Sequence, residues 1–141
     1  MLGFLGLAAV SIPWFYNTSL RLNPEAIQKA RELWLKSAHK NYDLHLLETR
    51  EPGAIRKEIL VKVRADQVEA VVENGQFLNP PERGNYSVSG ILDRMESELQ
   101  SARGAFITGA FSPTDGHPTR FVKRLGPERL EILLRLHPAG P

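Results

Sequence analysis

The chain of 141 residues contains no cysteine. This absence excludes disulfide bridges, cysteine-ligated zinc and iron–sulfur sites, and a thiol nucleophile. Nor is there a large excess of charge, because 18 lysine and arginine residues face 16 aspartate and glutamate residues. A net charge of +2 with no recognised nucleic-acid-binding motif predicts no nucleic-acid partner. The 42% of hydrophobic residues is typical of a globular chain with a core, and the length fits one domain.

The sequence motifs of common enzyme classes are also absent. Gly-x-x-x-x-Gly-Lys and Gly-x-Gly-x-x-Gly, which bind phosphates and dinucleotides, do not occur, nor does the Gly-x-Ser-x-Gly of serine hydrolases. No histidine lies within five residues of another, so the sequence contains no His-x-x-x-His pair for a metal ion. The sequence therefore predicts no cofactor, no metal and no identifiable catalytic residue, and it favours a protein that is not an enzyme.

The first 20 residues carry no charged side chain, and the first charge is Arg21. Twenty helical residues rise about 30 Å, which is close to the thickness of the hydrocarbon core of a bilayer. Trp14, Phe15 and Tyr16 end the apolar run, where an interfacial aromatic belt is expected. Residues 1–20 are therefore predicted to be an apolar helix that crosses the membrane once as a signal anchor. The alternative is a buried first helix of the domain.

The flanking residues bear on how this segment is processed and oriented. No basic residue precedes the apolar run and no small-x-small site follows it, so we expect the segment to stay attached or to be cleaved late. Arg21, Lys29 and Arg31 follow it, which by the positive-inside rule favours a cytoplasmic domain. This orientation conflicts with an extracytoplasmic domain. A start codon further upstream, encoding a basic region before the apolar run, would remove the conflict. We expect a domain outside the cytoplasm, at the membrane of a bacterial cell envelope.

Residues 21–137 are expected to form a single α+β domain, followed by a flexible tail at 138–141. Asn23-Pro24-Glu25 is typical of a helix start, because asparagine caps the first turn and proline fits the first helical position. An apolar stripe predicts the second helix, and alternation of apolar and polar residues predicts the strands. The predicted elements are a helix at 24–39, strands at 42–46, 59–63 and 68–72, a helix at 88–102, and strands at 105–111, 119–124 and 130–136.

This α-βββ-α-βββ order, with short turns between strands, implies antiparallel pairing. The simplest packing places both helices on one face of a single antiparallel sheet. Two segments leave alternatives open: residues 76–78 form a short strand or an irregular exit, and residues 130–136 also fit a helix although their period of two favours a strand. The helical phases place Trp34 and Leu92 in the core and Glu96 on the opposite face.

A series of landmarks lies between residues 30 and 124. They are Trp34, Asn41-Tyr42, Val61-x-Val63-Arg64, Tyr86-Ser87-Val88, Ile91-Leu92-Asp93 and Gly116-His117-Pro118-Thr119. Their order and spacing resemble a family of small, uncharacterised bacterial exported α+β domains, many of them lipoproteins. Members usually carry Cys-x-Cys in the first strand, where this chain has His45-Leu46-Leu47-Glu48. The resemblance implies an extracytoplasmic domain, brings no catalytic residues, and excludes any role that depends on the missing cysteines.

The Asp115-Gly116-His117 turn is the strongest candidate for chemistry, because it offers two metal-ligating side chains from one turn. A plain turn is favoured, in which aspartate caps locally, glycine takes a positive φ and Pro118 stiffens the exit. The alternative function is a small hydrolase or metal-dependent enzyme centred on this turn. It predicts that Asp115 and His117 meet a carboxylate or another histidine in a pocket.

Basic residues gather towards the C-terminus, where residues 103–137 carry six lysines and arginines against three acids. Ordinary solubilising charge on an exposed sheet face is favoured for these residues, with a patch facing anionic headgroups or an acidic partner as the alternative. The residues of this patch are Arg120, Lys123, Arg124, Arg129 and Arg135. The leading hypothesis is a membrane-tethered, non-enzymatic domain that binds a protein or small ligand at the cell envelope.

Overall fold

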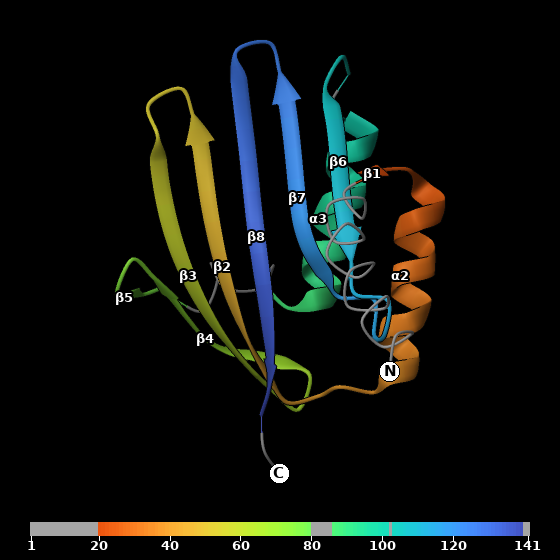
Figure 1. Cartoon of the computed structure of the whole chain (residues 1–141). Helices are drawn as coiled ribbons and strands as arrows, with labels where there is room; N and C mark the ends of the chain where they lie inside the picture. The colour runs from red at the N-terminus through yellow and green to blue at the C-terminus, as the bar shows by residue number, and fades with distance from the viewer. Residues whose placement is uncertain (1–19, 80–85, 102, 140–141) are drawn as a thin grey trace, which may run out of the picture.

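The computed structural model describes residues 20–79, 86–101 and 103–139, which form an α+β fold rich in antiparallel sheet (Figure 1). One eight-stranded sheet has the strand order β1-β6-β7-β8-β2-β3-β4-β5, and every pairing is antiparallel. The elements are β1 Leu20–Arg21, α2 Pro24–Ser37, β2 Tyr42–Glu51, β3 Ile55–Arg64, β4 Gln67–Glu73, β5 Gln76–Phe77, α3 Val88–Ser101, β6 Phe106–Phe111, β7 Pro118–Leu125 and β8 Glu128–Pro138.

The predicted α-βββ-α-βββ order is wrong. The chain runs β-α-ββββ-α-βββ, because β1 and β5 add a two-residue strand at each edge of the sheet. β5 lies within residues 76–78, where the sequence leaves a short strand as one of two alternatives, whereas β1 is not predicted, because two residues are too few to show a period of two. Pairing with a longer neighbour defines them instead, as Leu20 with Gly109 and Phe77 with Val72 show.

The predicted membrane segment falls almost entirely outside the described residues. Of residues 1–20 only Leu20 is described, and it belongs to β1. Within the part of the chain that the structure describes, no helix combines the length and apolarity needed to cross a membrane. At the other end of the domain, β8 runs through Pro138, and the Ala139 N–H donates to the Asn41 carbonyl at 3.1 Å.

Both helices lie on the same side of the sheet (Figure 1). We call this side the inner face and the opposite side the outer face. Residues that pair directly across antiparallel strands point to the same side, so the register assigns each residue to a face. In the central strand β2, alternate residues from Tyr42 to Glu48 point to the inner face and are buried. The outer face leaves Leu60 and Leu133 exposed.

The start and packing of the helices follow from local sequence. The Asn23 side chain accepts a hydrogen bond from the Ala26 N–H at 2.8 Å, and Pro24 begins α2, so the predicted cap is confirmed. Trp34 is 4% exposed and Leu92 is 1% exposed, which confirms the predicted burial of both side chains. Glu96 lies on the rim of α3, where its carboxylate is 3.5 Å from the guanidinium of Arg31.

The burial of α3 can be tested with two leucines that differ only in environment. We expect Leu92→Ala to lower the free energy of unfolding by about 2–5 kcal/mol, because it removes buried methyl groups and leaves a cavity. Leu35 of α2 is 75% exposed, so Leu35→Ala should change that free energy by less than about 0.5 kcal/mol. Urea denaturation of both variants measures the difference, and equal losses would contradict this packing.

Candidate functional site

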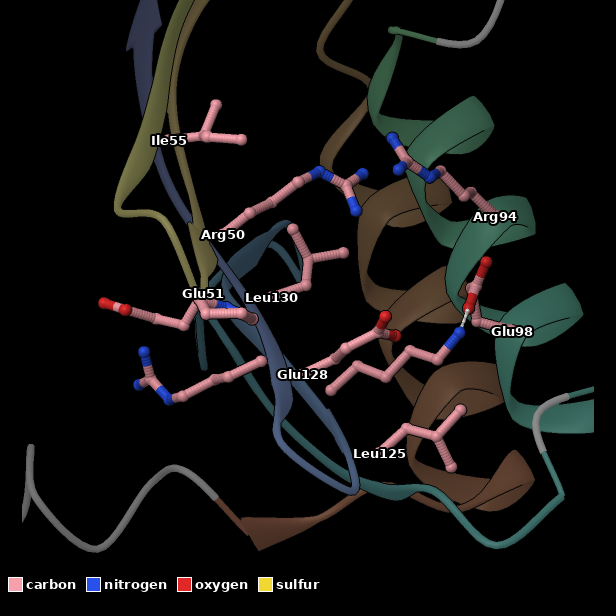
Figure 2. Close-up of a pocket in the computed structure, with 11 residues that line it drawn as sticks. Arg50, Glu51, Ile55, Arg94, Glu98, Leu125, Glu128 and Leu130 are labelled. Carbon is pink, nitrogen blue, oxygen red and sulfur yellow. Dashed lines mark hydrogen bonds and ion pairs between the residues drawn. The ribbon is translucent and has the colours of Figure 1, made fainter.

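A cleft of about 450 Å³ opens between the inner face and α3 (Figure 2). It lies at the end of the sheet where β2 turns into β3 and β7 turns into β8, so both connections contribute to its wall. Ile55, Leu125 and Leu130 supply apolar surface from three strands. Clefts of a few hundred cubic ångströms with apolar walls and a few polar groups are typical small-molecule sites. Of the cleft's charged residues, only Lys123 and Arg129 belong to the basic patch predicted from the sequence.

Two arginines approach the cleft from opposite walls. Arg50 comes from β2 and Arg94 from α3, and Figure 2 shows their guanidinium groups extending towards one another. Arg50 also contacts the buried carboxylate of Glu48, with its Nε 3.1 Å and its Nη2 3.0 Å from Oε1. Arg94 makes no ion pair with any residue that the structure describes. The guanidinium group of Arg94 is thus available to a ligand.

Further charges complete the cleft. Lys123 points to the inner face from β7, and its Nζ is 2.6 Å from Oε2 of Glu98 on α3. The carboxylate of Glu128 points into the cleft and has no ion pair among the described residues, whereas Glu51 points away from α3 (Figure 2). On β3, Lys57 pairs in register with Glu48, and its hydrogen bond to Glu73 raises the pKa of its ammonium group. The inner face is therefore charged at this end.

The predicted Asp115 and His117 do meet a second histidine, although they lie away from the cleft. Oδ1 of Asp115 is 2.5 Å from Nδ1 of His117, and Oδ2 is 3.3 Å from Nε2 of His39. His39 lies in the connection between α2 and β2 and contacts the ring of Trp34 at a centroid distance of 5.4 Å. The described residues contain no group of three histidine, aspartate or glutamate side chains placed to hold a metal ion.

The turn that carries Asp115 packs directly against α2. Gly116 has φ +80°, and a Cβ at this position would lie 2.2 Å from the Ala30 carbonyl oxygen, so only glycine fits. The Asp115 carboxylate also accepts the backbone N–H of His117 at 3.1 Å. Burial raises the pKa of Asp115, but the His117 N–H, the His117 ring and the Ser112 hydroxyl outweigh burial and hold that pKa below its ordinary value. These contacts give the turn a structural role.

The predicted basic patch is divided between the two faces of the sheet. Arg120 and Arg124 point to the outer face, whereas Lys123 points to the inner face and into the cleft. Arg129 and Arg135 lie opposite the inward-facing leucines of β8, as the alternation predicted. We call the outer surface of β1, β6, β7 and β8 the basic face. Its charged residues are Arg21, Arg120, Arg124, Arg129, Arg135 and Glu131.

A comparison of the chain with models of protein families, with curated proteins and with solved structures finds no match. The resemblance to exported bacterial domains therefore stays a prediction.

The pKa of Asp115 yields a pH-dependent prediction. A carboxyl whose pKa is lowered by folding contributes stability above the pKa of the unfolded chain, near 3.9, and that stability disappears as the pH falls through the folded pKa. We expect Asp115→Asn to lower the free energy of unfolding by about 1.5–3 kcal/mol near neutral pH and by much less below about pH 3. Urea denaturation at both pH values measures this.

The matched control is Asp93→Asn, which removes a mostly exposed carboxylate from an ion pair with Arg31. Exposed pairs contribute about 0–1 kcal/mol, so this variant should show little loss at either pH. A loss in Asp115→Asn that is the same at both pH values would contradict a lowered pKa.

Proposed function

We propose that this protein is a membrane-tethered, non-enzymatic binding domain of the cell envelope whose basic face rests on anionic lipid headgroups. The observation that carries the proposal is the uneven charge of the outer face. The basic face carries five arginines and one carboxylate, whereas the outer face of β2 to β5 carries three cations and four carboxylates. Positive charge is therefore concentrated on one half of one side of the sheet.

Two of the five arginines on the basic face share one carboxylate partner, and two others make no ion pair with a described residue. Glu131 contacts Arg120 at 2.8 Å and Arg129 at 3.4 Å. Arg124 and Arg135 are exposed and make no ion pair with a described residue. Each basic side chain close to an anionic membrane contributes about 1 kcal/mol, so this group is worth a few kcal/mol in attraction.

The position of β1 supports a lipid surface as the partner. β1 begins at Leu20, the last residue of the predicted membrane segment, and forms the edge of the sheet beside β6. Arg21 of β1 lies over the ring of Phe106 at 5.4 Å on the outer face, and the ring is 47% exposed. Leu133 is exposed among the arginines of β7 and β8. An apolar anchor next to a surface of arginines and exposed apolar side chains suits the boundary between headgroups and acyl chains.

The proposal predicts contact of Leu133 with lipid. Since the chain has no cysteine, Leu133→Cys and Leu35→Cys each give a single labelling site, one on the basic face and one on exposed α2. We expect a fluorophore at 133, in the full chain reconstituted into vesicles, to be quenched by a headgroup-linked quencher when phosphatidylglycerol is present. Quenching should fall in pure phosphatidylcholine and at high salt, because screening weakens attraction between exposed charges. A fluorophore at 35 should be quenched much less.

Charge reversal supplies the control for the same measurement. Arg124→Glu with Arg135→Glu should abolish the dependence on phosphatidylglycerol, whereas Lys29→Glu with Lys36→Glu, the same charge change on exposed positions of α2, should leave it intact. Equal quenching at the two labelled positions would contradict the docked orientation. Attachment to the membrane through residues 1–20 is tested separately, by cell fractionation with protease accessibility. A full-length product that is soluble and cytoplasmic would contradict that attachment.

A second candidate function is an enzyme centred on Asp115 and His117. The observation in its favour is that Asp115 holds Nδ1 of His117, which orients the ring and leaves Nε2 for proton transfer. General-base catalysis is worth about 10²–10⁴-fold, so His117→Asn should abolish most hydrolysis of p-nitrophenyl acetate by the protein. His137→Asn, which removes an exposed histidine of β8, should not. Equal rates in the two variants would contradict this candidate.

A further inference from the structure

Two charged side chains that point into the cleft beside α3 make no ion pair with a described residue, and they have opposite signs. Of the other charged residues that line the cleft, Glu51 points away from α3 (Figure 2), and Arg129 is paired with Glu131. Arg50 is paired with Glu48, and Lys123 is paired with Glu98. Arg94 and Glu128 remain, and neither makes an ion pair with a residue that the structure describes. Figure 2 shows both groups directed into the cleft. A ligand that neutralises both must carry an anionic group and a cationic group.

The arginine end of the cleft is suited to a carboxylate. The guanidinium groups of Arg50 and Arg94 extend towards one another from the two walls, so an anion placed between them receives donors from both sides (Figure 2). Guanidinium groups bind carboxylates through paired, charge-assisted hydrogen bonds. Arg50 is itself held by the buried carboxylate of Glu48, which fixes where its side chain points.

The remainder of the cleft is suited to an apolar body that ends in an ammonium group. The side chain of Leu130 lies between the end of Arg50 and the carboxylate of Glu128, and Leu125 lies on the far side of Glu128 (Figure 2). An ammonium group at Glu128 gains a charge-assisted bond, whereas a second anionic group there meets like charge. The 450 Å³ volume is that of a small-molecule site.

We infer that this cleft binds a small zwitterion whose carboxylate lies between Arg50 and Arg94, whose ammonium group lies at Glu128, and whose apolar spacer contacts Leu130. The chemical class includes ω-amino carboxylates and short peptides with free ends. The three charged groups that hold the ligand do not belong to the basic face, so the inference does not depend on where that face docks, although Arg129 of the basic face also lines the cleft.

The probes are 6-aminohexanoate and two molecules that each lack one of its charges, hexanoate and hexylamine. They are titrated into the full chain, held in a nonionic detergent, by calorimetry. We expect 6-aminohexanoate to bind at least about tenfold more tightly than either single-charge molecule, since a hydrogen bond to a charged group is worth about that factor or more. Leucine, whose charges are adjacent, should bind more weakly than 6-aminohexanoate.

Two single substitutions assign the ends of the ligand. Arg94→Gln should reduce the preference for 6-aminohexanoate over hexylamine, because the carboxylate loses one of its two guanidinium partners and keeps only Arg50, which is already paired with Glu48. Glu128→Gln should make hexanoate and 6-aminohexanoate bind alike, because the ammonium group loses its partner. The matched controls, Arg103→Gln and Glu32→Gln, change the same residue types at exposed positions outside the cleft and should leave all affinities unchanged.

Circular dichroism confirms that each variant folds, so a lost affinity can be assigned to the cleft. Three outcomes would overturn the inference: equal affinities for the three probes, a preference for hexanoate, or a preference for 6-aminohexanoate that survives both cleft substitutions. A further test uses the free energy of unfolding of the ligand-free protein. If the double variant Arg94→Gln with Glu128→Gln loses much less than the sum of the two single losses, the two residues are each other's partners and the inference is overturned.

Discussion

The strands of the sheet are longer than the two helices that cover it, and this difference in length determines where the cleft lies. β2 and β3 have ten residues each, which span about 33 Å, whereas α2 and α3 have 14 residues each, which span about 21 Å. Helices of this size leave part of the inner face uncovered. The sequence of β2 matches this limit, because its inward residues change from Tyr42, Leu44 and Leu46 to Glu48 and Arg50.

Tyr42 fixes which end of the inner face the helices cover. Its side chain is fully buried, its ring meets Trp34 of α2 edge-on at 5.1 Å, and its hydroxyl accepts the Val88 N–H at the start of α3 at 3.1 Å. One residue of the central strand thus contacts both helices. Burial raises the pKa of this hydroxyl, so it stays protonated and can donate as well as accept. The opposite end of β2 is left for the charged residues of the cleft.

The sequence predicts the fold best where one side chain in two must be apolar. Alternation of apolar and polar residues around Tyr42 and Val61 predicts the central strands. The ends of β2 and β3 that meet at their turn, from Leu47 to Lys57, show no such alternation. In β7, Phe121 and Val122 are both apolar and both buried, so the pattern does not say whether Lys123 points inwards. The ion pair with Glu98 and the register with β8 decide it.

The candidate sites show the same limit. Asp115 and His117 are close enough in sequence to be noticed together. His39 is 76 residues from Asp115 in the chain, directly after the left-handed Ala38 that ends α2, and only the fold brings it to Asp115. Arg94 and Glu128 resemble ordinary surface charges in the sequence, since nothing local marks them as facing one cleft. Their common position depends on where α3, which contacts β7, lies relative to the turn between β7 and β8, and this is a property of the whole fold.

The two proposals use opposite faces of one sheet, and this has a geometric consequence. The arginines of the basic face alternate along β7 and β8 with the inward side chains of Lys123 and Leu130, which line the cleft. A domain whose basic face rests on a bilayer therefore holds the cleft on the side of the sheet away from the lipid. A ligand for the cleft then arrives from the aqueous phase, which suits a zwitterion, because such a molecule is strongly hydrated and partitions poorly into a bilayer. In the two proposals, the alternation of β7 and β8 thus assigns lipid contact and ligand contact to opposite faces of the sheet, with Arg129 as the one arginine of the basic face that also lines the cleft.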